Sequence, residues 1–198
     1  MRPGRRSPRT RLILTLAALA SLIGGYYAGQ YWQRRPLAAI SAIVYPAARP
    51  IDYPQGLGIA TDPGSTDSWR LFLTTDTRVA QCRSLLHHLA SMVNRLAARP
   101  DIQQRLRVAL LAYDHPDAEA VMQFSGGADW VEVIPGQEAE LDRLSGQLGI
   151  LPATRAWCEP SQANGILVAP DRKAWALIPY EQAAIMADNI RTIIDFVE

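Results

Sequence analysis

Leu71-Phe-Leu-Thr-Thr-Asp-Thr-Arg-Val-Ala-Gln-Cys82-Arg-Ser-Leu-Leu86 is the stretch that decides the fold. An apolar run typical of a buried strand, Trp69 to Thr74, passes through a polar loop into a helix. That helix carries Cys82 in its first turns, where unpaired N–H groups and the positive end of the helix dipole favour a thiolate. We therefore expect the chemistry of this chain, if any, to lie at this junction.

The pattern downstream predicts alternating helices and strands. Apolar residues at helical spacing indicate a helix over about 79–98, for which Asp76 or Thr77 is the expected N-cap. Further strands are expected at 106–113, 130–134, 166–169 and 174–178, with helices over 118–124, around 141–148 and around 186–197. Pro170-Asp171-Arg172-Lys173 is typical of a hairpin turn. This order predicts an α/β sandwich with a mixed central sheet, compatible with a thioredoxin-like fold.

The N-terminal region has a different composition. Residues 1–11 contain five arginines and form the expected cytoplasmic basic tail, and residues 12–32 carry no formal charge over a length that can span a bilayer. Tyr26, Tyr27, Tyr31 and Trp32 suit an interfacial aromatic belt, which favours an uncleaved transmembrane anchor over a signal peptide. Only Arg34 and Arg35 closely follow the span, so the positive-inside rule predicts a single-pass protein of the bacterial inner membrane with its domain in the periplasm.

The remaining chain divides into a tether and a domain. Residues 33–50 read as a Pro-rich tether, and a globular domain is expected over 51–198. From residue 36 onward the chain has 13 basic and 19 acidic residues, so a nucleic-acid partner is not expected. The sequence has no phosphate-binding glycine loop, GxSxG elbow or HExxH motif, so the common hydrolase and nucleotide chemistries lack a signature and an enzyme is not favoured.

The three histidines are candidate metal ligands. His87 and His88 follow Cys82 by five and six residues, a poor spacing for a shared ligand set, so a surface or packing role is favoured. His115 lies at the end of a predicted parallel strand, where Asp114 and Asp117 could complete a hard-metal or acid/base set. A turn rich in Asp and Pro before a helix is the simpler interpretation.

Several segments together resemble the SCO/SenC family, membrane-anchored thioredoxin-like proteins that deliver copper during cytochrome c oxidase assembly. The resemblance spans the chain: the N-terminal anchor, the segments 45–51 and 69–73, Leu110-Leu-Ala-Tyr-Asp-His-Pro-Asp117, the helix region 138–150 and Ile166-Leu-Val-Ala-Pro-Asp171. It implies a thioredoxin-like fold and an accessory role in oxidase assembly, with oxidase subunits or other assembly factors as partners.

The copper site that the resemblance implies is degenerate here. The family uses a CxxxC pair and a distant histidine, a ligand set that suits copper. Cys82 matches the second cysteine, whereas the first falls on Arg78 or a neighbouring residue and the histidine at or near Ser161. A fixed cation at Arg78 opposes metal binding and favours an ionised Cys82.

Cys158 belongs to the loop that, in the family, folds over the cysteine loop. Three alternatives stay open for Cys82 and Cys158: a buried and an incidental thiol, a disulfide, or a two-thiolate copper(I) site. They correspond to three hypotheses for function: an SCO-like accessory protein with a degenerate copper site, a thiol redox or Cu(I)-handling protein, and a membrane-tethered binding module on a thioredoxin-like scaffold.

Overall fold

The structure, a computed structural model, describes residues 8–34, 37–59, 67–150, 158–159 and 163–198, in two compact units. The first unit, Met1–Ala39, contains the helix α1 (Pro8–Arg34) and the 3-10 turn η1 (Leu37–Ala39). In the described part of the chain, no helix is both long and apolar enough to cross a membrane. The helical conformation predicted over 12–32 is therefore confirmed, but its role as a transmembrane span is not.

The second unit, Ile40–Glu198, is built on a six-stranded mixed sheet. Its strands have the order β1-β6-β5-β2-β3-β4. Strands β2, β3 and β4 are parallel, whereas β5 runs antiparallel to β2, and β6 pairs antiparallel with both β5 and β1. The bounds are β1 (Ile43–Pro50), β2 (Trp69–Thr75), β3 (Leu106–Ala112), β4 (Val131–Pro135), β5 (Gly165–Val168) and β6 (Lys173–Ile178).

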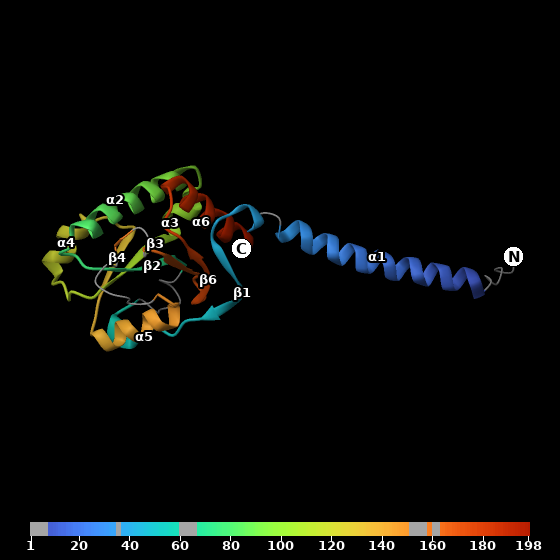
Figure 1. The fold of residues 1–198 in the computed structure, drawn as a ribbon, viewed down its shortest axis with the longest axis horizontal. Helices are drawn as coiled ribbons and strands as arrows, with labels where there is room; N and C mark the ends of the chain where they lie inside the picture. The colour runs from blue at the N-terminus through green and yellow to red at the C-terminus, as the bar shows by residue number, and fades with distance from the viewer. Residues whose placement is uncertain (1–7, 35–36, 60–66, 151–157, 160–162) are drawn as a thin grey trace. The chain divides into compact units, whose positions relative to one another are not determined.

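Helices cover both faces of this sheet (Figure 1). Helices α2 (Ala80–Arg95) and α6 (Ala183–Val197) pack together on one face, and α5 (Glu138–Leu148) lies on the other. The other short helices are η2 (Gln55–Leu57), η3 (Leu96–Ala98), α3 (Pro100–Arg105) and α4 (Ala118–Ser125). These elements confirm the predicted α/β, thioredoxin-like sandwich with a mixed central sheet.

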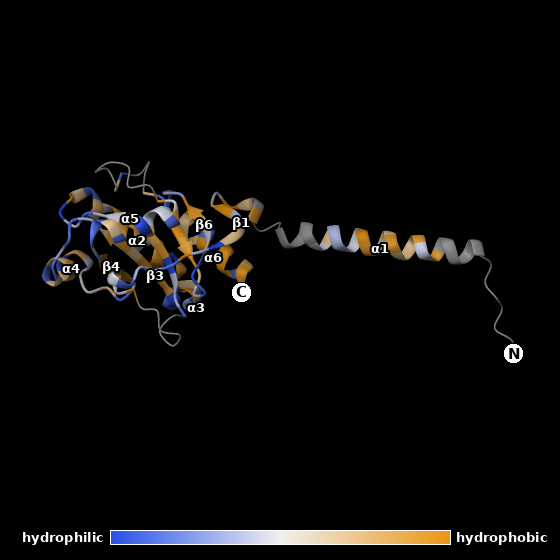
Figure 2. Ribbon diagram, turned by 90° about the horizontal axis from the view of Figure 1, so that it is seen from below, coloured by the Kyte–Doolittle hydropathy of each residue, from blue (hydrophilic) through white to orange (hydrophobic). Residues whose placement is uncertain are grey.

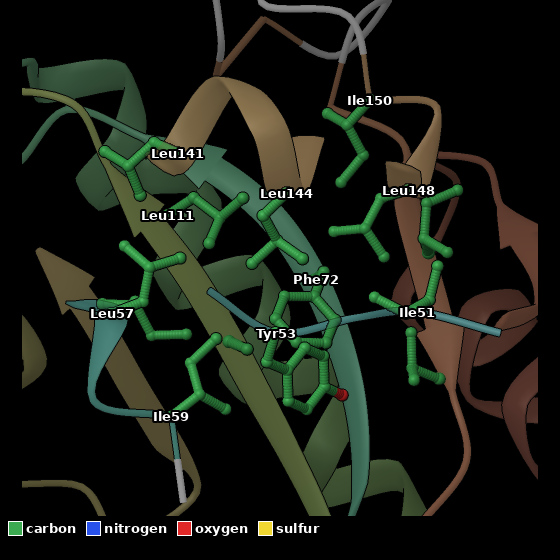
Figure 3. Close-up of a cluster of buried hydrophobic side chains, with 14 of the residues drawn as sticks. Ile51, Tyr53, Leu57, Ile59, Phe72, Leu111, Leu141, Leu144, Leu148 and Ile150 are labelled. Carbon is green, nitrogen blue, oxygen red and sulfur yellow. The ribbon is translucent and has the colours of Figure 1, made fainter. Parts of the chain in front are cut away.

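The core follows the alternation of side chains along the strands. Every residue of β2 is buried, because the strand lies inside the sheet with both faces covered. Phe72 points into the cluster on the α5 face, together with Tyr53, Leu111 and Leu144 (Figure 3). Colouring by hydropathy shows hydrophobic residues along the inner strands of this unit (Figure 2).

One strand lies where the sequence indicated a tether. β1 pairs with β6 at the edge of the sheet, and the compact unit begins at Ile40 rather than near Ile51. Its pairing register shifts between Val44 and Arg49, a stretch that contains Pro46. Proline lacks an N–H group and is tolerated in edge strands and at such irregularities. Because prolines and small residues occupy much of this strand, its sequence lacks the apolar alternation by which strands are recognised.

Candidate functional site

The cysteine loop (Thr75–Cys82) lies at the carboxyl end of the parallel strands. β2 and β3 are parallel neighbours in a register that sets Thr75 beside Ala112, so the chain segments that follow them leave the sheet side by side. The Thr77 backbone N–H and hydroxyl both donate to Asp114 Oδ2, at 3.1 and 2.5 Å. The loop after β2 is thus joined to the turn after β3, at the edge where α/β sheets place their sites.

Cys82 and Cys158 form a disulfide. Their Cα atoms are 4.9 Å apart, and both residues are buried. Cys82 lies at the third position of α2, on the inward face that the sequence predicted, and Cys158 comes from the segment between α5 and β5. Of the three alternatives that the sequence left open, the structure has the disulfide.

The two sulfur atoms have different polar neighbours. The Asp76 backbone N–H donates to Cys82 Sγ at 3.4 Å. Cys158 Sγ lies 4.0 Å from the hydroxyl of Thr75, at the outer limit of a hydrogen bond to sulfur. Both contacts come from the end of β2, so this strand positions the loop against the disulfide.

Arg78, at the position of the family's first cysteine, is engaged by carboxylates. Its Nε and Nη2 atoms donate to Asp76 at 3.2 and 3.1 Å, and Nε lies 3.6 Å from Asp114 Oδ2. Burial raises the pKa of Asp76, but hydrogen bonds from the Arg78 side chain and backbone, with the Arg78 charge, outweigh it and hold that pKa below its usual value. The expected N-cap role of Asp76 or Thr77 is wrong: Val79 is the N-cap of α2 and gives no side-chain hydrogen bond.

The turn after β3 divides the set Asp114, His115 and Asp117. Asp114 has a side chain only 1% exposed and faces the cysteine loop. Asp117 caps α4 by accepting from Ala120 N–H at 2.8 Å, as a turn before a helix requires. His115 has a positive φ of 50° and lines a separate surface cavity. The structure therefore does not join these residues into one metal or acid/base set.

The other two histidines lie outside the site. His88 forms a hydrogen bond of 2.7 Å with the Glu181 carbonyl oxygen and stacks against Tyr180, which is the expected packing role. His87 is exposed on α2. Ser161, the expected position of the family's histidine, lies outside the described residues.

The residues present do not fit a three-ligand copper site. Both cysteine sulfurs are bonded to each other, and Arg78 brings a cation where a thiolate would be needed. Over residues 8–34, 37–59, 67–150, 158–159 and 163–198, no group of three or more His, Cys, Asp or Glu side chains could hold a metal ion. Copper(I) binding by Cys82 and Cys158 after reduction stays a prediction.

The sequence missed how Asp114 and the loop are coupled. Asp114 was recognised as a residue at the end of a strand, but not as the acceptor for Thr77, 37 positions earlier in the chain. The usable signal was the order of strand, helix and strand over 69–113, because such a unit sets two strands parallel and their following turns leave the sheet at the same edge.

Comparison with solved structures shows the fold. The apo Sco1 protein from Thermus thermophilus has a TM-score of 0.56 at 15% identity, covering 79% of this chain and 96% of that one. Copper-bound ScoI of Arabidopsis thaliana has a TM-score of 0.54 at 11% identity, covering 65% of this chain and 85% of that one. BsSco is described as a member of the Sco family of cytochrome c oxidase assembly proteins with a disulfide switch. It has a TM-score of 0.53 at 15% identity, covering 78% of this chain and 93% of that one.

No protein-family model matches the chain, and no curated protein is significantly similar to it in sequence. The resemblance drawn from the sequence is therefore confirmed at the level of the fold: the second unit has a divergent, Sco-like thioredoxin fold.

Proposed function

We propose that this chain is a Sco-like thiol–disulfide protein that acts as an accessory in the assembly of respiratory cytochrome c oxidase. The observation that carries the proposal is the disulfide between Cys82 and Cys158 at the carboxyl end of the parallel strands. It occupies the place where this fold holds its reactive sulfur, and the Asp76 N–H is directed at one of the two sulfur atoms.

The cellular role rests on the similar structures. BsSco is described as a cytochrome c oxidase assembly protein with a disulfide switch, and its fold matches most of this chain. The cysteines of this chain are arranged differently. The pair joins α2 to the segment before β5, whereas the two cysteines of the family's CxxxC pair lie in one loop. We therefore place the activity in thiol–disulfide exchange with an oxidase subunit or another assembly factor.

Membrane attachment is a further part of the proposal. The charge-free run over 12–32, with five arginines before it, supports a single-pass anchor with the N-terminus in the cytoplasm and the second unit in the periplasm. Carbonate extraction of membranes is expected to leave the full chain in the pellet, and a periplasm-dependent reporter fused after residue 198 is expected to be active. Release by carbonate, or an inactive fusion, would refute this part.

The proposal is tested by genetic complementation. Deleting the gene is expected to lower cytochrome c oxidase activity, and the full chain is expected to restore it. Cys82→Ser and Cys158→Ser should not restore it, whereas Ser84→Ala, a matched loss of one exposed hydroxyl on the same helix, should. If both cysteine variants restore full activity, the chain acts without its sulfurs, as a binding module.

A second candidate function is Cu(I) handling by the reduced pair. The observation in its favour is the 4.9 Å Cα separation, which would leave two thiolates close together after reduction. Anaerobic Cu(I) titration of the reduced full chain decides it, with Cys82→Ser as the control. Stoichiometric binding that the control abolishes would favour copper handling over exchange; no binding would leave exchange as the function.

A further inference from the structure

The two sulfur atoms of the disulfide are not equivalent. Cys82 Sγ accepts a hydrogen bond from the Asp76 N–H at 3.4 Å and lies in the first turn of the 16-residue helix α2. Cys158 Sγ has the Thr75 hydroxyl at 4.0 Å and lies outside any helix. Burial does not separate the two residues, which are 3% and 5% exposed. Among the described residues, the two sulfur atoms therefore differ in the groups that would stabilise a negative charge.

The geometry points to a direction for thiol–disulfide exchange, and this inference rests on the proposed function. When a thiolate attacks a disulfide, the sulfur that leaves is the one whose thiolate is better stabilised. An N–H donor and a helix N-terminus both stabilise a thiolate. We propose that an incoming thiolate attacks Cys158 Sγ and that Cys82 leaves.

The step balances without another reactant. The attacking thiolate, from a small thiol or a cysteine of a partner protein, forms a bond to Cys158 Sγ. The bond between Cys158 and Cys82 breaks, and its electron pair stays on Cys82 Sγ as a thiolate. The attacking sulfur is oxidised and Cys82 is reduced, with one negative charge before and after. A second thiolate then releases Cys158.

Asp114 is the positioning residue for this direction. Its Oδ2 accepts both the N–H and the hydroxyl of Thr77, and Thr77 directly follows the residue whose N–H reaches Cys82. The Asp114 side chain is almost fully buried, so its interactions are directed inward at the loop. Asp114 therefore holds the cysteine loop in the conformation that aims the Asp76 N–H at sulfur.

The direction can be read from the wild-type chain. The oxidised full chain is mixed briefly with reduced glutathione, quenched with acid, blocked with N-ethylmaleimide and digested with trypsin. Cleavage after arginine places the cysteines on separate peptides, 79–83 and 156–172. Glutathione is expected on 156–172 in about tenfold excess over 79–83, since one hydrogen bond to the leaving sulfur is worth about that factor.

The outcomes distinguish this inference from the proposed function. Glutathione mainly on 79–83, or equally on both peptides, would overturn the direction and leave thiol–disulfide exchange in place. If neither peptide carries glutathione and the disulfide stays intact, both the direction and the exchange function fail.

The role of Asp114 is tested in the same assay. Asp114→Ala is expected to lower the ratio of the two adducts about tenfold, toward unity, because the loop loses its anchor. Asp114→Asn keeps an acceptor for Thr77 and should keep most of the ratio. Asp117→Ala, in the same turn but capping α4, should leave the ratio unchanged. An unchanged ratio in Asp114→Ala would refute the positioning role. If that variant does not fold, Thr77→Val, which removes the hydroxyl that donates to Asp114, supplies the same readout.

Discussion

The two faces of the sheet are covered in different ways. One face carries α2 and α6, helices of 16 and 15 residues that also contact each other. The other carries α5, of 11 residues, and a leading segment (Ile51–Ile59) whose only regular structure is one 3-10 turn. Side chains on both faces are nevertheless completely buried: Leu89 on the first and Leu144 on the second have no exposed surface.

The difference shows that burial of a sheet face does not require a helix. An irregular segment can serve if its backbone groups find hydrogen-bond partners. Here Gln147 of α5 accepts from the Asp52 N–H at 2.8 Å and donates to the Asp52 carbonyl oxygen at 3.2 Å, and the Ile51 N–H donates to the Arg172 carbonyl oxygen. The leading segment is thus hydrogen-bonded both to α5 and to the turn between β5 and β6.

The largest expected effect is on the face covered by α2, because its first turn is covalently held. The double variant Cys82→Ala/Cys158→Ala is expected to lose about 4 kcal/mol of the free energy of unfolding, since the disulfide closes a separation of 76 residues. Urea unfolding under non-reducing conditions measures it, with Ser84→Ala as the control. A loss below about 1 kcal/mol would mean that the bridge contributes little to folding.

A matched pair of truncations tests whether the two faces are equally well packed. Leu57→Ala in the leading segment and Leu89→Ala in α2 are each expected to cost about 3 kcal/mol, because both residues are buried and leave a cavity. Urea unfolding of both variants gives the comparison. If Leu57→Ala costs far less than Leu89→Ala, the leading segment is a loose cover rather than part of the core.

A smaller effect is expected where the leading segment approaches the loop before α5. A Cβ at Gly136 would lie 2.2 Å from Leu57 Cδ2, so Gly136→Ala should cost about 2 kcal/mol through overpacking. A Cβ at Gly146, inside α5, meets nothing within 4 Å, so Gly146→Ala should stabilise by about 0.5 to 1 kcal/mol. Thermal unfolding of the two variants should shift in opposite directions; equal shifts would contradict the close contact.

The smallest effect concerns acid. Because Arg78 holds the pKa of Asp76 below 3.8 in the folded state, Asp76 stabilises the fold above the unfolded-state value. That contribution is lost as the pH falls through this value toward the folded pKa. The deficit of Asp76→Asn relative to wild type in urea unfolding should therefore shrink between about pH 6 and pH 3. Asp129→Asn, the loss of an exposed carboxylate, controls for net charge; a deficit independent of pH would contradict the Arg78 interaction.

Local sequence patterns predicted most helices and strands of the second unit. The strands β2 and β3 and the helix α2 were predicted closely, because each is a continuous apolar run or a clear amphipathic repeat. β1 was missed because Pro46 and Pro50 interrupt any strand pattern at the sheet edge. The leading segment was placed inside the expected domain over 51–198, but its burial in the core was not predicted, because neither helical nor strand periodicity marks its buried residues.

The site was predicted only as far as local sequence reaches. Cys82 and its place in α2 follow from the junction of strand and helix. Its bond to Cys158 depends on a distance between residues 76 positions apart, which no local pattern contains. The partner of Asp114 was missed for the same reason, because Thr77 approaches it only through the pairing of β2 with β3.

The disulfide also has a mechanical consequence. The covalent ring that it closes contains most of α2 together with η3, α3, β3, α4, β4 and α5, and in the sheet the two ringed strands lie together on one side of β2. Tension applied between residues 40 and 198 would bypass the ring through the two sulfur atoms. Roughly 260 Å of extended chain, for 76 residues, would stay hidden from the pulling force until the bridge is reduced. Reduction of the disulfide would then let this part of the chain extend. Force spectroscopy with reductant would record one additional extension step that is absent without reductant.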